Sequence, residues 1–64
     1  MKIDGTKLKE LRELKHLSRL DIALSAGWQS IQQVYKLEKS GGHVNDNIGK
    51  AIARRLSARV EDIQ

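Results

Sequence analysis

The chain has 64 residues, with 12 Lys and Arg against 8 Asp and Glu, a formal net charge of +4 and no cysteine. This length allows one small domain, over residues 1–64, with a thin core. The lack of cysteine excludes a disulfide framework and a thiolate metal site, and it favours a reducing, cytoplasmic location. No apolar run is long enough to span a bilayer. Because Pro is absent and aromatic residues are scarce, we expect helices rather than a sheet.

A first helix is predicted to begin at Asp4 or Thr6 and to end near residue 15 or 16. Its apolar side is marked by Ile3, Leu8 and Leu11. Arg12 lies among these apolar positions and would need a partner if it were buried. From the residues alone, a solvated arginine on the helix surface is the expected arrangement.

Two short helices are predicted between Ser18 and Glu38, each with its own start signal. Ser18 can cap the first, and Asp21, three residues later, can complete a capping box with it. Ser30 and Gln33 have the same relation at the start of the second helix. Two capped helices in close succession indicate a helix-turn-helix.

A glycine separates these two helices. Ala26-Gly27 is predicted to end the first one, because glycine adopts the left-handed conformation of a helix end at little steric cost. Apolar residues recur at helical spacing and are expected to face the core, namely Ile22, Ala23, Ala26, Val34 and Leu37. The outer face of the second helix then carries Ile31, Gln32, Tyr35 and Lys36.

The polar run KSGGHVND, residues 39–46, predicts a flexible loop after Glu38. Asn45 is expected to cap the next helix, and Asp46 suits the positive N-terminal end of that helix. The apolar stripe of the helix is Ile48, Ile52 and Leu56. A last short turn over residues 59–63 is expected to close the core with Val60 and Ile63.

The order of these residues resembles the DNA-binding domain of the Cro and phage-repressor type helix-turn-helix proteins, the XRE-type family. The resemblance runs from about Leu8 to Ile63. Its elements are Leu8-x-x-Leu11-Arg12, then Leu17-Ser18-x-x-x-Ile22-Ala23-x-x-Ala26-Gly27, Ser30-x-x-x-Val34-x-x-Leu37-Glu38, Ile52-Ala53-x-x-Leu56 and Val60-x-x-Ile63. The resemblance implies an all-α, lambda-repressor-like fold, a compact bundle of about five short helices in which the second and third form the helix-turn-helix.

The chain departs from the family's pattern in the turn and in the following loop. The family usually places the capping Ser or Thr two residues after the turn glycine, whereas Ser30 comes three residues after Gly27. The turn is therefore predicted to be longer by one residue, with Trp28 packed over it as a cover for the core. The loop GGHVND is also less basic than is common in the family.

The resemblance implies that helix 31–38 makes base contacts through Ile31, Gln32, Tyr35 and Lys36. A glutamine amide can bond an adenine edge, and a lysine can donate to O6 and N7 of guanine. The resemblance also implies phosphate contacts, for which the candidates are Arg19, Ser30, Gln33, Lys39, Ser40, Gly41 and His43. It further implies an internal ion pair between Arg12 and Glu38, tying the first helix to the end of the third.

The predicted function is sequence-specific binding of double-stranded DNA by a transcriptional regulator, a repressor. The resemblance implies a homodimer, for which the exposed apolar candidates are Leu20, Leu24, Val60 and Ile63. Two alternatives remain: the antitoxin of a toxin–antitoxin pair, with the toxin as protein partner, and a helical protein-interaction module that does not bind DNA.

Other functional classes have little support in the sequence. His16 and His43 are far apart and have no cysteine beside them, so we expect no metal site. No nucleophile motif or cofactor motif is present, and we expect neither catalysis nor a cofactor. Binding to a membrane surface is not expected, because the basic residues are spread over several predicted helices.

Overall fold

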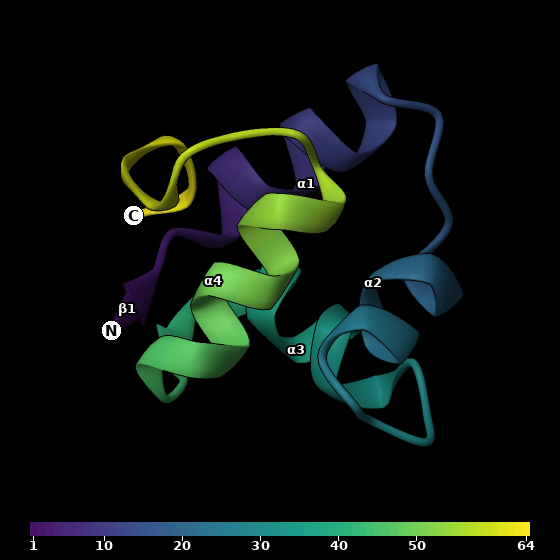
Figure 1. Cartoon of the computed structure of the whole chain (residues 1–64). Helices are drawn as coiled ribbons and strands as arrows, with labels where there is room; N and C mark the ends of the chain where they lie inside the picture. The colour runs from purple at the N-terminus through teal and green to yellow at the C-terminus, as the bar shows by residue number, and fades with distance from the viewer.

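The computed structural model covers the whole chain, residues 1–64 (Figure 1). The elements in chain order are β1 (Lys2–Ile3), α1 (Gly5–Leu14), α2 (Arg19–Ser25), α3 (Gln32–Ser40), β2 (Gly42–His43), α4 (Asp46–Arg55) and a 3-10 helix, η1 (Val60–Ile63). The two termini lie on one side of the molecule, and α2 lies on the opposite side. None of the helices combines the length and the apolar character needed to cross a membrane.

The start of α2 is capped as the sequence predicts. The amide of Asp21 donates to Oγ of Ser18 at 3.1 Å, and the amide of Ser18 donates to Oδ2 of Asp21 at 2.8 Å. Asp4 caps α1 by accepting from the amide of Lys7, and Asn45 caps α4 in the same way. At these three helix starts a side chain replaces the missing intrahelical partner of a backbone amide.

The capping box predicted at the start of α3 is wrong. Ile31 already has helical dihedrals, with φ −79° and ψ −7°, and occupies the N-cap position without a side-chain cap. Ser30 therefore lies one residue too early, and its Oγ only accepts from the amide of Gln32 at 3.3 Å. α3 begins at Gln32 and extends to Ser40, so it ends two residues later than the predicted helix 31–38.

The connection between α2 and α3 spans residues 26–31. Gly27 has φ +79°, as expected for the left-handed residue that ends α2. The amide of Trp28 donates to the carbonyl of Ala23 at 2.9 Å, and the indole packs against the edge of the core. The prediction of Trp28 as a cover for the core is confirmed.

A small antiparallel sheet corrects two predictions. Lys2 pairs with His43 and Ile3 pairs with Gly42, so part of the predicted flexible loop is a strand. Ile3 belongs to this sheet and directly precedes Asp4, the N-cap of α1. The fold is thus mostly helical but not all-α. The sheet was missed because a two-residue strand has no alternating pattern, and its partner lies about forty residues away in the chain.

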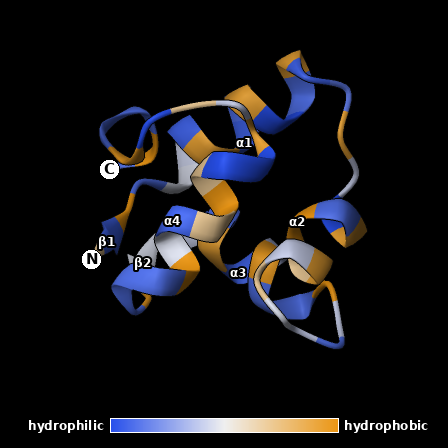
Figure 2. Ribbon diagram, viewed as in Figure 1, coloured by the Kyte–Doolittle hydropathy of each residue, from blue (hydrophilic) through white to orange (hydrophobic).

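The core lies between the four α-helices, and each of them contributes buried apolar residues to it (Figure 2). Its ten buried apolar residues are Ile3, Leu8, Ile22, Ala23, Val34, Leu37, Ile52, Ala53, Leu56 and Ile63. Ile63 is completely buried, so its prediction as an exposed dimer contact is wrong: η1 folds back and inserts this side chain under α1 and α4. Val60 is partly buried, whereas Leu20 and Leu24 are exposed.

The N-terminus of α1 approaches the C-terminal end of α3 very closely. A Cβ at Gly5 would lie 2.2 Å from the carbonyl oxygen of Leu37 and 2.6 Å from that of Glu38. Only glycine fits between these two backbones. This contact sets the position of α1 relative to α3, which carries the candidate site.

Candidate nucleic-acid interface

The outer side of α3 is exposed and carries varied chemistry. Gln32, Tyr35 and Lys36 are spaced three and four residues apart, which places them on one face of the helix. Ile31 precedes them at the N-cap and is 45% exposed, and Tyr35 is 51% exposed. On the opposite side of α3, Val34 and Leu37 are buried in the core. The four residues predicted to contact bases therefore lie together on an accessible surface.

A buried carboxylate fixes the C-terminal half of α3. Only 3% of the Glu38 side chain is exposed, and its Oε2 accepts from Nε of Arg12 at 2.5 Å. A second nitrogen of Arg12, Nη2, donates to Oε1 at 3.3 Å, while Nη1 donates to the carbonyl of Leu17 at 2.9 Å. The ion pair expected between Arg12 and Glu38 is present, and the simpler expectation of a solvated Arg12 is wrong. The paired and hydrogen-bonded guanidinium compensates for the loss of water around both charges.

Arg19 joins this ion pair from the start of α2. Its Nε donates to Oε1 of Glu38 at 2.9 Å, and its guanidinium lies over the ring of Tyr35, 5.2 Å from the centroid. A third of the Arg19 side chain remains exposed, at 34%. Arg19 was predicted to contact phosphate, but its charge is already shared with Glu38. Its clearest structural role is to connect α2 to α3 and to hold the ring of Tyr35.

Three cations and Tyr35 line a shallow hollow of about 180 Å³, and we call these cations the basic cluster: Lys9, Arg19 and Lys39. Glu38 also lines this hollow. Sequence reasoning missed Lys9. Lys9 could have been found from its position three residues before Arg12, because this spacing places both residues on one face of α1. Once Arg12 is paired with Glu38, Lys9 must also lie near α3.

The other predicted phosphate contacts do not form one group. Ser30 precedes α3, whereas Lys39 and Ser40 form its last turn and are not in a loop as expected. Gly41 follows as the C-cap of α3, with φ +68°, and His43 lies on β2. Gln33 is exposed on α3 and lines a groove beside Trp28. These residues lie at both ends of α3 rather than at one site.

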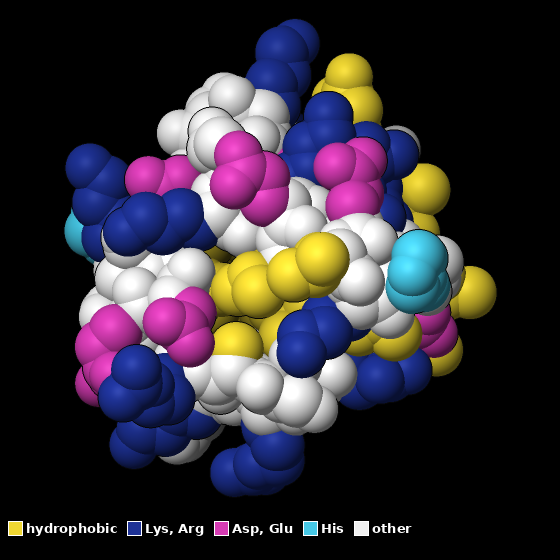
Figure 3. Space-filling model, turned by 90° about the horizontal axis from the view of Figure 1, so that it is seen from above, with side chains coloured by type: hydrophobic (Ala, Val, Ile, Leu, Met, Phe, Trp, Pro, Cys, Tyr) yellow, Lys and Arg dark blue, Asp and Glu magenta, His cyan; other side chains and the backbone are white.

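Charged and apolar side chains are distributed unevenly over the surface (Figure 3). Lys and Arg occur all around the outline of the face shown, whereas one group of hydrophobic side chains lies near its centre and others lie along its right-hand side. The most exposed large apolar residues include Leu14 at 71%, Leu24 at 65% and Leu20 at 51%. Leu20 and Leu24 are four residues apart and lie on one face of α2.

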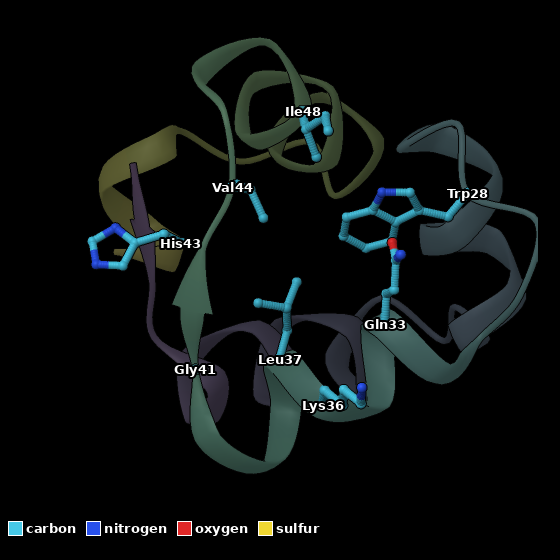
Figure 4. Close-up of a pocket in the computed structure, with 8 residues that line it drawn as sticks. All are labelled: Trp28, Gln33, Lys36, Leu37, Gly41, His43, Val44 and Ile48. Carbon is cyan, nitrogen blue, oxygen red and sulfur yellow. The ribbon is translucent and has the colours of Figure 1, made fainter.

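A groove of about 370 Å³ runs along the side of α3 that faces α4 (Figure 4). Trp28, Leu37, Val44 and Ile48 form its apolar walls, and Gln33 points toward the indole. Lys36 lies at its margin, while the ring of His43 points away from the opening. The lining comes from α3, α4, β2 and three connections, which are those before α3, between α3 and β2, and between β2 and α4.

The N-terminal turn of α2 holds a carboxylate in its charged form. The backbone amide of Ser18 is the main cause of a lowered pKa for Asp21, and the Ser18 hydroxyl and the nearby Arg55 act in the same direction. Desolvation opposes them and raises the pKa, but by less. Asp21 therefore supports the helix start that presents Arg19.

The structure contains no group of three or more His, Asp or Glu side chains placed to hold a metal ion. Comparison with known proteins adds no relative: no family model, curated protein or solved structure matches this chain.

Proposed function

We propose that this chain is a helix-turn-helix protein of the Cro and phage-repressor type, which binds a specific sequence of double-stranded DNA and represses transcription. The observation that carries the proposal is the exposed face of α3 with Gln32, Tyr35 and Lys36. This face lies on a helix held by Glu38 to both α1 and α2. Rigid support of this kind is what base readout in the major groove requires.

The roles of the groups on α3 follow from their chemistry. The amide of Gln32 can both donate to and accept from an adenine edge, and Lys36 can donate to guanine. Ile31 offers an apolar contact for a thymine methyl group, and Tyr35 offers a ring and a hydroxyl. In this arrangement α3 enters the major groove with its N-terminal half, which is also its most exposed part.

Within the basic cluster, Lys9 and Lys39 supply the proposed backbone contacts, because the charge of Arg19 is already shared with Glu38. Lys9, Arg19 and Lys39 come from three different helices and lie around one hollow beside Tyr35. Phosphate contacts made there would fix the position of α3 without reading bases. The net charge of +4 supports an electrostatic attraction to DNA as well.

The test is selection of bound sequences from a random duplex library. The parent protein is compared with the double variant Gln32→Ala/Lys36→Ala and with a matched control, Lys15→Ala/Gln64→Ala, which removes the same residue types at exposed positions away from α3. We expect the parent and the control to enrich the same two-fold related motif. The α3 variant should bind that motif about 10- to 100-fold more weakly. Absence of any enriched motif with the parent would refute sequence-specific binding.

A homodimer is part of this proposal, because two-fold related motifs require two copies of α3. The exposed side chains of Leu20 and Leu24 are the apolar candidates for a contact between copies. Analytical ultracentrifugation with and without the selected duplex should give a dimer mass on DNA. A monomer mass under both conditions would contradict the homodimer.

A second candidate function is protein binding without DNA, either as an interaction module or in an antitoxin. It is favoured by three exposed leucines, Leu14 at the end of α1 and Leu20 and Leu24 on α2. Salt dependence separates the two functions, since DNA affinity must fall steeply as salt is raised. Salt-insensitive or absent affinity for duplex DNA would favour the protein-binding function.

A further inference from the structure

The groove between α3 and α4 has the size and lining of a small-ligand site. Its volume of about 370 Å³ lies near the lower end of the range of about 300–1,000 Å³ usual for ligand pockets. Half of its lining residues are hydrophobic, and the rest include the amide of Gln33 and the cation of Lys36. Such a space is too small for a helix or a second domain, but it can accept a ring with a short side chain.

The polar residues of the groove favour a ligand that carries an anionic group. Among the lining residues there is no Asp or Glu, and Lys36 takes part in no ion pair. The amide of Gln33, one turn earlier on the same helix, lies against the indole of Trp28 (Figure 4). An anionic oxygen at the margin of the groove could therefore accept a charge-assisted hydrogen bond from the ammonium group of Lys36.

The apolar residues of the groove favour an aromatic ring in the same ligand. The indole of Trp28 borders the opening from one side, and Leu37, Val44 and Ile48 surround the space in front of it. An aromatic ring placed here would gain contact with the indole in addition to apolar burial. We propose that this groove binds a small aromatic carboxylate, with the ring between Trp28 and Val44 and the carboxylate at Lys36.

This ligand would act as a negative effector, and that step rests on the proposed DNA-binding function. Lys36 is both the cation at the margin of the groove and a proposed base-contacting residue. A carboxylate bound to its ammonium group would compete with guanine for the same donor. Ligand and DNA are then expected to weaken each other's binding by the same factor.

The test of the groove itself needs no DNA. Trp28 is the only tryptophan, so its fluorescence reports directly on occupancy of the groove. The probe is 4-phenylbutyrate, and 4-phenylbutan-1-ol is its uncharged analogue. We expect a saturable change with 4-phenylbutyrate at a Kd on the order of 1 mM. The alcohol should bind about fivefold more weakly, because it lacks the charge that pairs with Lys36.

Matched variants locate the site. Lys36→Gln should weaken 4-phenylbutyrate binding about fivefold, whereas Lys39→Gln, the same change on the same helix but outside the groove, should leave it unchanged. Val44→Phe fills the groove and should weaken binding of both probes. Since Lys36 and Lys39 are exposed, both glutamine variants should fold, which thermal unfolding verifies. No saturable change, equal binding of acid and alcohol, or equal effects of the two lysine variants would overturn the proposal.

The effector step is tested with the selected duplex. Millimolar 4-phenylbutyrate should lower the affinity of the parent for this duplex, and 4-phenylbutan-1-ol should have less effect. If the duplex affinity does not change although the groove is occupied, the effector role is refuted. If the parent binds no duplex at all, the proposed DNA-binding function fails, and the fluorescence titration still decides whether the groove binds the carboxylate.

Discussion

The guanidinium of Arg19 lies over the ring of Tyr35, 5.2 Å from its centroid, and joins the first residue of α2 to the exposed face of α3. The same guanidinium donates to Glu38 at 2.9 Å, so it cannot swing away from the ring without losing an ion pair. The ring of Tyr35 is therefore held in place before any partner binds. For a side chain proposed to contact bases, this lowers the conformational entropy lost on binding.

Removal of the Tyr35 ring should lower the stability of the fold slightly. Tyr35→Ala should lower the free energy of unfolding by about 0.5–1 kcal/mol, because an exposed cation–π contact is lost. Tyr35→Phe keeps the ring and should leave stability unchanged. Urea unfolding measures the difference. Equal stability of the alanine variant and the parent would show that the stacking of Arg19 contributes nothing.

Loss of the buried ion pair between Arg12 and Glu38 should destabilise the fold more than loss of an exposed charge. Arg12→Ala leaves a carboxylate that is almost fully buried, and we expect a loss of about 3–5 kcal/mol in the free energy of unfolding. Lys15→Ala, an exposed change only three residues away, should remain within about 0.5 kcal/mol of the parent. Near-neutral stability of Arg12→Ala would mean that Arg19 alone satisfies Glu38.

Two glycines should respond differently to the same substitution. Gly5→Ala places a methyl group against the backbone carbonyls of Leu37 and Glu38 and should destabilise the fold by about 1–3 kcal/mol or more. This loss is expected even though alanine is the better helix former. At Gly27 nothing lies within 4 Å of the new Cβ, so Gly27→Ala should cost only the left-handed strain of about 1 kcal/mol. Thermal or urea unfolding of both variants checks the order.

The basic cluster should appear in the salt dependence of DNA binding. Lys9→Ala and Lys39→Ala should each weaken binding to specific and random duplexes alike, and each should reduce the slope of log K against log salt by about 1. Gln32→Ala should instead weaken only the specific duplex. Fluorescence anisotropy at several salt concentrations measures all three. An unchanged slope for Lys9→Ala would remove α1 from the interface.

The capping box of α2 should lose its contribution in acid. The hydrogen bond from the Ser18 amide lowers the pKa of Asp21 below its ordinary value of 3.8. Its stabilising effect is therefore fully present above about pH 4 and disappears as pH falls through the lower pKa of the folded state. Asp21→Asn should lack this part of the acid dependence, while Glu10→Gln should retain it. Unfolding at pH values from about 2 to 6 compares the three proteins, and identical curves would contradict the assignment.

Local sequence signals determined much of this protein. The caps at Ser18 and Asn45, the glycine end of α2 and the apolar spacing of α3 and α4 were all predicted and are all present. Each depends on groups within about four residues of one another, so the chemistry that decides them can be read directly in the chain. The failure at Ser30 shows the limit of such signals, because one extra residue in the turn moved the cap out of reach.

Tertiary structure decided the contents of the candidate site. The basic cluster needs α1, α2 and α3 in contact, the β1–β2 pairing joins segments about forty residues apart, and the groove beside Trp28 exists only once α4 faces α3. The ion pair of Arg12 and Glu38 was expected from a family resemblance and not from the spacing of its residues. These features are contacts between distant segments, and their geometry follows from the packing of the whole core.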